Sequence, residues 1–192
     1  MQQTFGDFVK ERDGQEYLEV HFSPTSVPLQ QRWRNNSLSA NFLAEYWTTF
    51  FPAQDLPSQR RQQEIKGAIG YIANELLENI MKFSYKPANY PVTLGLYLYQ
   101  DAFRFYTRNA IDPQMVAGFQ TRIQTLLSED TQALYLQQLE QNALETDNAS
   151  SQLGLLTLIN DYGARLAWLF ETLVDDSEPE LTIVTTMAEL AI

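Results

Sequence analysis

The stretch that decides the fold is residues 58–84, SQRRQQEIKGAIGYIANELLENIMKFS. Apolar residues recur along it every three or four positions, which is the spacing of one face of an α-helix. These residues are Ile65, Ile69, Ile72, Leu76, Ile80 and Phe83. The stretch therefore predicts one long helix that buries a continuous apolar face.

Three polar side chains follow one another on the same helix. Glu75, Asn79 and Lys82 are three or four residues apart, so they share one side of it. At ~100° per residue they lie roughly 90° round the helix from the apolar face, at the rim of a core. A carboxylate, an amide and an ammonium so placed can serve magnesium, its water and a phosphate chain. The same spacing also suits an ordinary solvated face with a Glu75–Asn79 hydrogen bond.

The remaining segments alternate between strand-like and helical patterns. Strands are predicted at 16–23, 92–99, 102–108, 164–170 and 181–187, and further helices at 37–51, 113–127, 131–145 and 153–162. In the helix at 37–51, a buried stripe is predicted at Leu38, Phe42, Leu43, Trp47 and Phe50. A polar loop is predicted at 146–152, and an acidic turn at Asp175 to Glu180. Short turns join the strand pairs, which predicts an α/β (α+β) two-layer sandwich, with a mostly antiparallel sheet and helices on one face.

Composition narrows the function classes. The chain has 192 residues, a net charge of −11 and no cysteine, so nucleic acid and anionic membranes are disfavoured partners and thiolate metal sites are excluded. No apolar run approaches the ~20 residues of a membrane span, and the N-terminus is polar. We expect a single cytoplasmic domain over residues 1–192, with no membrane insertion.

A glycine at the start of a predicted helix lies shortly before the C-terminal strands. The run SSQLGLLTLINDYG, residues 150–163, places Gly154 after a Ser-rich loop at the start of a predicted helix. Helix N-termini bind phosphate through free backbone N–H groups. Close packing at the helix start is an alternative reason for a glycine there.

Together, these two elements resemble the GHKL (Bergerat-like) ATPase fold of sensor histidine kinases and anti-sigma-factor serine kinases. NELLENIMKFS, residues 74–84, resembles its N-box, and residues 150–163 resemble its last glycine box. Within that fold the chain resembles the SiaB family of small bacterial kinase-like proteins, over roughly residues 16–188. The further details are the N-box E-x-x-x-N-I, an asparagine after the second central strand (Asn109), and an extra helical hairpin before the glycine box.

The resemblance implies a role for each matched residue. Glu75 would be the catalytic general base, and Asn79 the magnesium ligand. Lys82 would approach the phosphates of ATP or ADP, and Asn109 would sit where adenine is read. Leu153, Gly154 and Leu155 would lie at the phosphate-binding helix start.

The resemblance also implies a partner. A SiaB-type kinase phosphorylates a SiaC-type protein, so we expect a regulatory, partner-switching serine/threonine kinase in bacterial signal transduction. Relatives with this fold often pair, which makes a homodimer a further expectation.

This sequence departs from the family pattern at two places. The region TRNAIDPQ lacks the usual D-x-G-x-G, although Asp112 is near, and Gln152 stands close to the first glycine of the last box. A side chain at that place narrows the approach of backbone to phosphate. The alternative is therefore a non-catalytic interaction module that kept the fold and lost its nucleotide site.

Overall fold

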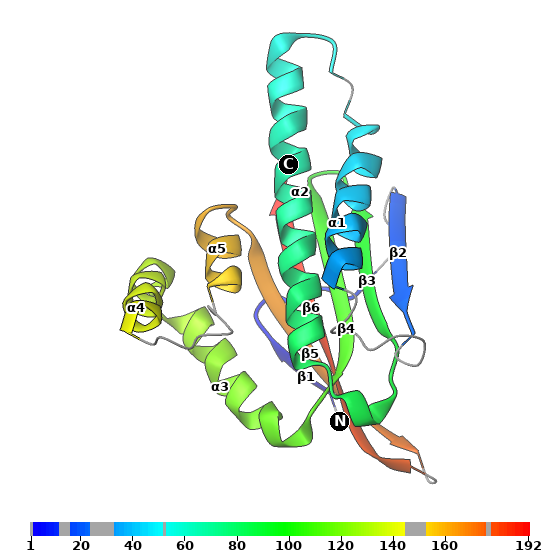
Figure 1. Cartoon of the computed structure of the whole chain (residues 1–192), viewed down its shortest axis with the longest axis vertical. Helices are drawn as coiled ribbons and strands as arrows, with labels where there is room; N and C mark the ends of the chain where they lie inside the picture. Colours follow the sequence, from blue (N-terminus) through cyan, green and yellow to red (C-terminus); the bar gives the residue numbers. More distant parts are fainter. Residues whose placement is uncertain (1, 12–15, 24–32, 52, 145–152, 176–177) are drawn as a thin grey trace.

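A single six-stranded sheet organises the chain (Figure 1). The computed structural model describes residues 2–11, 16–23, 33–51, 53–144, 153–175 and 178–192. The strand order is β1-β5-β6-β4-β3-β2, and every neighbouring pair is antiparallel. The strands are β1 (Gln2–Phe5), β2 (Glu16–Phe22), β3 (Val92–Leu98), β4 (Ala102–Ile111), β5 (Arg165–Asp175) and β6 (Glu178–Ala191).

The helices lie on one face of this sheet (Figure 1). Among the described residues they are α1 (Trp33–Thr48), α2 (Leu56–Phe83), α3 (Pro113–Ser128), α4 (Thr131–Leu144) and α5 (Gly154–Asn160), with a 3-10 turn η2 (Lys86–Ala88) before β3. The α/β two-layer sandwich that the sequence predicts is thus confirmed. None of these helices is long and apolar enough to span a bilayer.

α2 is the long helix of the predicted stretch, and both its ends are defined locally. Asp55 caps its start: the Asp55 carboxylate accepts from the Ser58 N–H at 2.8 Å, while the Asp55 N–H donates to Ser58 Oγ at 3.0 Å. At its end, Ser84 leaves the helix in an extended conformation. The predicted apolar face is buried from Ile65 to Ile80, but Phe83 is 47% exposed, so that part of the prediction was wrong.

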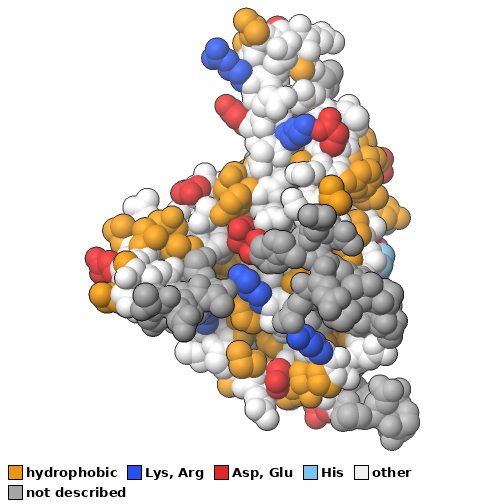
Figure 2. Space-filling model, viewed as in Figure 1, with side chains coloured by type: hydrophobic (Ala, Val, Ile, Leu, Met, Phe, Trp, Pro, Cys, Tyr) orange, Lys and Arg blue, Asp and Glu red, His pale blue; other side chains and the backbone are white. Residues whose placement is uncertain are grey.

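α1 buries only part of the predicted stripe. Trp47 and Leu43 are fully buried, together with Ala40 and Ala44. The side chains of Leu38, Phe42 and Phe50, predicted to be buried, are instead exposed, and Figure 2 shows apolar side chains on this outer side of α1. The physical reason is close helix packing: the Ala44 methyl group faces Gly70 of α2, and only small residues permit that approach.

β4 and its partner β6 are longer than predicted. Asn109 and Ile111 lie inside β4, where they pair with Val184 and Thr182 of β6. Asn109 therefore does not follow the strand, as the sequence predicted, but is part of it. The polar strand β1 was not predicted, and it is held by its pairing with β5. The predicted loop at 146–152, with Gln152, lies outside the described residues, as does the centre of the acidic turn.

The sheet has an apolar core on the helix side and a second, smaller cluster on the other side. Phe103, Phe105 and Ile111 of β4 belong to the main core, whereas Tyr106 belongs to the smaller cluster with Tyr97. The N-terminal segment crosses that second face, where the Tyr106 hydroxyl donates to the Val9 carbonyl at 3.0 Å. Because side chains alternate along a strand, Thr107 and Asn109 face the helices.

Candidate functional site

The C-terminal half of α2 carries the three residues singled out in the sequence. Glu75 and Asn79 are half-buried, one turn apart, and Lys82 lies at the more exposed end. They flank the fully buried Leu76 and Ile80, so the trio lies at the rim of the core, as its spacing predicted.

Glu75 meets the first residue of α5. A Cβ atom built on Gly154 would lie 3.0 Å from Cδ of Glu75 and closer still to Oε2. The carboxylate therefore fills the space that a side chain at residue 154 would need. Gly154 does not have a positive φ, so its backbone conformation does not require glycine. The lack of space for a side chain does. The fold thus brings together the two sequence elements that resemble the N-box and the glycine box.

The surroundings of Glu75 favour its protonated form. Burial raises the pKa of the Glu75 carboxyl, and the negative charge of Glu78 adds to this effect. The ammonium of Lys82 and a hydrogen bond from Tyr71 partly offset it by lowering the pKa. A carboxylate with a raised pKa at the rim of a core is better suited to accepting a proton than an ordinary surface carboxylate.

Tyr71 is a neighbour of Glu75 that sequence reasoning missed. Its ring stacks on Tyr162, which follows α5, with centroids 4.9 Å apart and planes 20° apart. This pair holds α5 against α2 one turn before Glu75. The only signal in the sequence was its place on the helix, four residues before Glu75.

The side-chain amide of Asn79 has a nitrogen that makes no described hydrogen bond. Its amide nitrogen is buried and has no hydrogen-bond partner among the residues that the structure describes. A buried donor without a partner costs about 1–3 kcal/mol, so such groups call for an explanation. A ligand with a hydrogen-bond acceptor at this place would satisfy the donor.

Lys82 is engaged within its own helix. Its ammonium lies 3.6 Å from the carboxylate of Glu78, which also accepts from the Asn74 amide at 3.2 Å. The side chain of Lys82 is 34% exposed, so this ion pair is a weak one. Lys82 can therefore turn toward an anion at small cost.

Asn109 lies beside the C-terminal end of α2. Ser84 forms an isolated antiparallel bridge with Ile111, and the Tyr85 N–H donates to the Ala110 carbonyl at 2.9 Å. Asn109 is 6% exposed, and its amide nitrogen donates to the Ala110 carbonyl at 3.0 Å. The Asn109 side chain is thus tied to the backbone of its own strand.

Two threonines join Asn109 on that face, and sequence reasoning missed both. Thr107 lies two residues earlier on β4, and it pairs directly with Thr186 of β6. The alternation FRFYTRN would have placed Thr107 and Asn109 on the same side as Phe103 and Phe105, had the strand been extended to Ile111. Together they form a polar strip within a largely apolar layer.

The other predicted positions have mainly structural contacts. Asp112 caps α3, since its carboxylate accepts from the Gln114 N–H at 2.9 Å. Leu153 stands at the start of α5 without a side-chain cap. Leu155 packs against the main core. Of the three glycine-box residues, Gly154 alone has a described contact with the trio.

The described residues contain no group of three or more histidine and acidic side chains placed to hold a metal ion. Magnesium in nucleotide sites is commonly held by one or two protein ligands together with phosphates and water. Asn79 fits that kind of partial site and would not form a metal site by itself.

The comparisons with known proteins point to the fold. No protein-family model matches this chain, and no curated protein matches its sequence. Its structure is similar to that of a chain in the crystal structure of the SiaB–SiaC complex from Pseudomonas aeruginosa, with a TM-score of 0.52 and 14% sequence identity. The likeness covers 91% of this chain and 89% of that chain, so it concerns the whole arrangement of helices and sheet. The chain therefore shares its fold with that structure.

Proposed function

We propose that this chain is a regulatory protein of the SiaB type. It would bind ATP or ADP with magnesium through a GHKL-type site and phosphorylate a small SiaC-type partner on serine or threonine. The observation that carries the proposal is the contact between Glu75 and Gly154, which joins the two motif-like elements in the order and fold that the proposal requires.

The residues present fit such a site in part. Asn79 offers a buried amide whose unpartnered nitrogen could donate to a phosphate oxygen, while its oxygen is the atom that could ligate magnesium. Lys82 stands one turn further on at the rim. Asn79 would hold magnesium, Lys82 would contact phosphate, and the Asn109 oxygen would face the base. Bound magnesium and ATP would supply the phosphoryl group and neutralise its charge.

Glu75 would act on the partner. Its raised pKa makes it a suitable acceptor for the proton of a serine or threonine hydroxyl group. In the arrangement described here the carboxylate lies against Gly154. It must turn away from the start of α5 before an anion can approach the backbone there.

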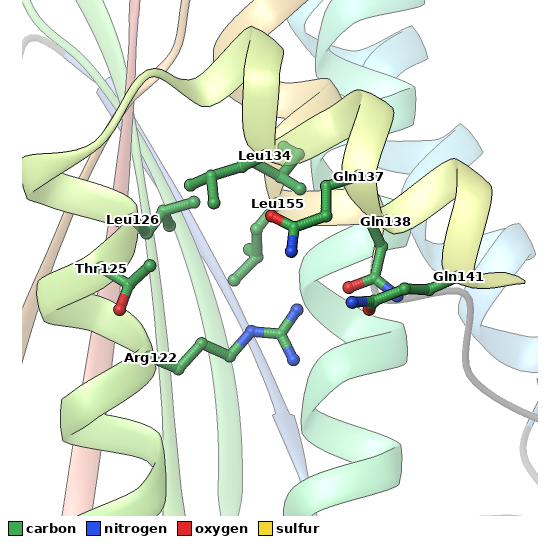
Figure 3. Close-up of a pocket in the computed structure, with 9 residues that line it drawn as sticks. Arg122, Thr125, Leu126, Leu134, Gln137, Gln138, Gln141 and Leu155 are labelled. Carbon is green, nitrogen blue, oxygen red and sulfur yellow. The ribbon is translucent and has the colours of Figure 1, made fainter.

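A non-catalytic interaction module is the second candidate, and the contact between Glu75 and Gly154 favours it. Glu75 already fills the space beside Gly154, and Lys82 is paired with Glu78. Glu75, Asn79 and Asn109 do not line the cleft between α3 and α4 (Figure 3), nor the one beside the N-terminal half of α2. Such a module would bind its partner without using nucleotide.

Calorimetric titration with ADP and with a non-hydrolysable ATP analogue, each with and without magnesium, separates the two candidates. We expect saturable, magnesium-dependent heat from the wild type and loss of the magnesium dependence in Asn79→Ala. Asn74→Ala, on the same helix, is the matched control and should bind like the wild type. No heat at millimolar nucleotide would exclude the kinase and leave the interaction module.

Phosphoryl transfer needs its own test. The chain would be mixed with a SiaC-type protein from the same organism and radiolabelled ATP, and the label on that protein would be measured. We expect transfer by the wild type and none by Glu75→Gln. Complex formation without transfer, together with no nucleotide binding, is the result expected of the interaction module. Size-exclusion chromatography of the chain alone would show whether it is a homodimer.

A further inference from the structure

The two edge strands of the sheet differ in length and in composition. β1, at one edge, has four residues, three of them polar. β2, at the other edge, has seven residues, and its Leu18 and Val20 pack half-buried against the main core. Among the described residues, no strand pairs with the outer edge of β2. That edge therefore offers a row of backbone N–H and C=O groups to another strand.

An apolar ridge runs along α1, made of Leu38, Phe42, Tyr46 and Phe50. The Phe42 and Phe50 rings lie 6.3 and 5.7 Å from the ring of Tyr46 between them, measured between centroids. The side chains of Leu38, Phe42 and Phe50 are exposed. At ~100° per residue, Phe42 lies roughly 160° round α1 from Ala44, whose methyl group faces α2. The ridge therefore points away from α2.

The ridge and the edge of β2 lie on the same side of the molecule. α1 stands between α2 and β2 in Figure 1, and a side-chain hydrogen bond joins Tyr46 of α1 to Glu16 of β2. Because the ridge points away from α2, it extends toward the outer edge of β2. An apolar surface beside an open strand edge is typical of an interaction site.

A second copy of the chain fits both features at once. If two β2 strands pair antiparallel about a two-fold axis perpendicular to the sheet, the helices of both copies stay on the same face. The two α1 ridges then face each other across that axis. A single contact would cover the strand edge and the ridge together.

The sequence of β2 selects the register of such a pairing. Pairing centred on Glu19 would place two carboxylates directly opposite each other, which is destabilising. Pairing centred on Val20 places Glu19 opposite His21 of the second copy, and Leu18 opposite its Phe22. Within one chain the His21 imidazole already lies 3.2 Å from the Glu19 carboxylate, so these two groups are compatible partners. The register centred on Val20 thus matches polar with polar and apolar with apolar side chains.

We propose that the outer edge of β2 and the ridge of α1 form one interface with a second copy of this chain, in which the two β2 strands pair antiparallel about Val20 and the two α1 ridges meet beside them.

Sedimentation velocity of the wild type over a range of protein concentrations tests the interface without nucleotide. We expect a reversible monomer–dimer equilibrium with a dissociation constant roughly in the micromolar range, as for an interface of modest size. Because each copy has a net charge of −11, added salt should tighten the dimer. A wild type that stays monomeric at about 0.5 mM protein would overturn the proposal.

Variants on the ridge and on the strand test the assigned contacts. Leu38→Ser should weaken the dimer about tenfold, while Leu136→Ser, an equally exposed position on α4, should leave it within about twofold. His21→Glu sets two carboxylates opposite each other and should also weaken it about tenfold, whereas His21→Lys should retain it. Equal effects of the two leucine changes, or of the two His21 changes, would contradict the interface.

Single cysteines report the register, since the chain has none of its own. Directly opposite residues of antiparallel strands have Cα atoms about 4.5–5.5 Å apart, within reach of a disulfide. Val20→Cys should therefore cross-link into a dimer under mild oxidation. Leu18→Cys should not, because the two copies of residue 18 would be roughly 14 Å apart along the strands. Preferential cross-linking through residue 18 would show that the register is wrong.

A different occupant of this edge would also be detected. A SiaC-type protein that binds the chain in competition with dimer formation would assign the edge to that protein and overturn the proposal. The nucleotide titration measures other residues, so failure of either proposal leaves the other one standing.

Discussion

The carboxylate of Glu75 occupies the space in which a side chain of residue 154 would stand. Glu75 lies in the C-terminal half of the long helix α2, and Gly154 begins the short helix α5 far along the chain, so the contact joins these two helices. It puts an acid with a raised pKa beside a helix start, where backbone N–H groups have no partner within the helix. The contact has energetic consequences that can be measured.

Gly154→Ala should be destabilising in the wild type and harmless in a Glu75→Ala background. The new methyl group would displace the Glu75 carboxylate, whereas without that carboxylate alanine simply favours the helix over glycine. We expect a coupling free energy of about 1 kcal/mol from a double-mutant cycle of urea unfolding. Additive effects would show that the two residues are not in contact.

Glu75→Gln should stabilise the protein at neutral pH. Since burial raises the folded-state pKa of Glu75, the folded state holds its proton more tightly than the unfolded state. Stability due to this group therefore falls as pH rises from the unfolded pKa through the folded one. Glutamine removes that cost, and for a group still partly solvated we expect a gain of about 0.5 kcal/mol at pH 7.

The same comparison at low pH is the control. The advantage of Glu75→Gln should vanish below about pH 4, where the carboxyl group is protonated in both states. Thermal unfolding at several pH values would show it. A stability difference that does not change with pH would mean that the charge of Glu75 is not the cause.

Arg104→Ala should cost more stability than Arg165→Ala, although both arginines bind Glu189. Arg104 donates from Nε to the nearly buried Glu189 at 2.6 Å and lies 4.4 Å over the Tyr99 ring, with a side chain 20% exposed. Arg165 also pairs with Glu189, but its side chain is 72% exposed. We expect losses of about 2 kcal/mol and at most about 1 kcal/mol, respectively, in urea unfolding.

The pH dependence of this triad has the opposite sign to that of Glu75. Burial raises the pKa of Glu189, but the hydrogen bonds from Arg165 and Arg104 outweigh it, so the folded-state pKa is lowered. Its contribution is present above the unfolded pKa, near pH 4, and is lost as pH falls through the folded pKa. Glu189→Gln should therefore differ from the wild type most at neutral pH.

Trp47→Ala should be severely destabilising and Phe42→Ala nearly neutral. Trp47 is fully buried and meets Phe103 edge to face at 5.3 Å between centroids, whereas Phe42 is 57% exposed. We expect a loss of about 3–5 kcal/mol for Trp47 and within about 0.5 kcal/mol for Phe42, from urea unfolding. Equal losses of stability for the two variants would mean that Phe42 is buried as fully as Trp47.

Features that depend on neighbouring residues were predictable from the sequence. The apolar spacing of 58–84 predicted α2 and its buried face, and the short turn at Gln100–Asp101 predicted the β3–β4 hairpin. The buried stripe of α1 was predicted only in part. Leu43 and Trp47 are buried as predicted, but Leu38, Phe42 and Phe50 are exposed, and the small residues Ala40 and Ala44 face inward. The end of β4 was placed too early, since Asn109 disfavours strands, and pairing with Val184 overrides that preference.

The sequence by itself determined the five helices and the strands other than β1, the apolar face of α2 up to Ile80, and the rim position of Glu75, Asn79 and Lys82. A helix of known period fixes which residues share a side. Only the tertiary structure decided that Glu75 meets Gly154 and that Asn109 faces the helices. These relations join segments far apart in the chain. Their geometry depends on helix packing and strand register, which no local pattern encodes.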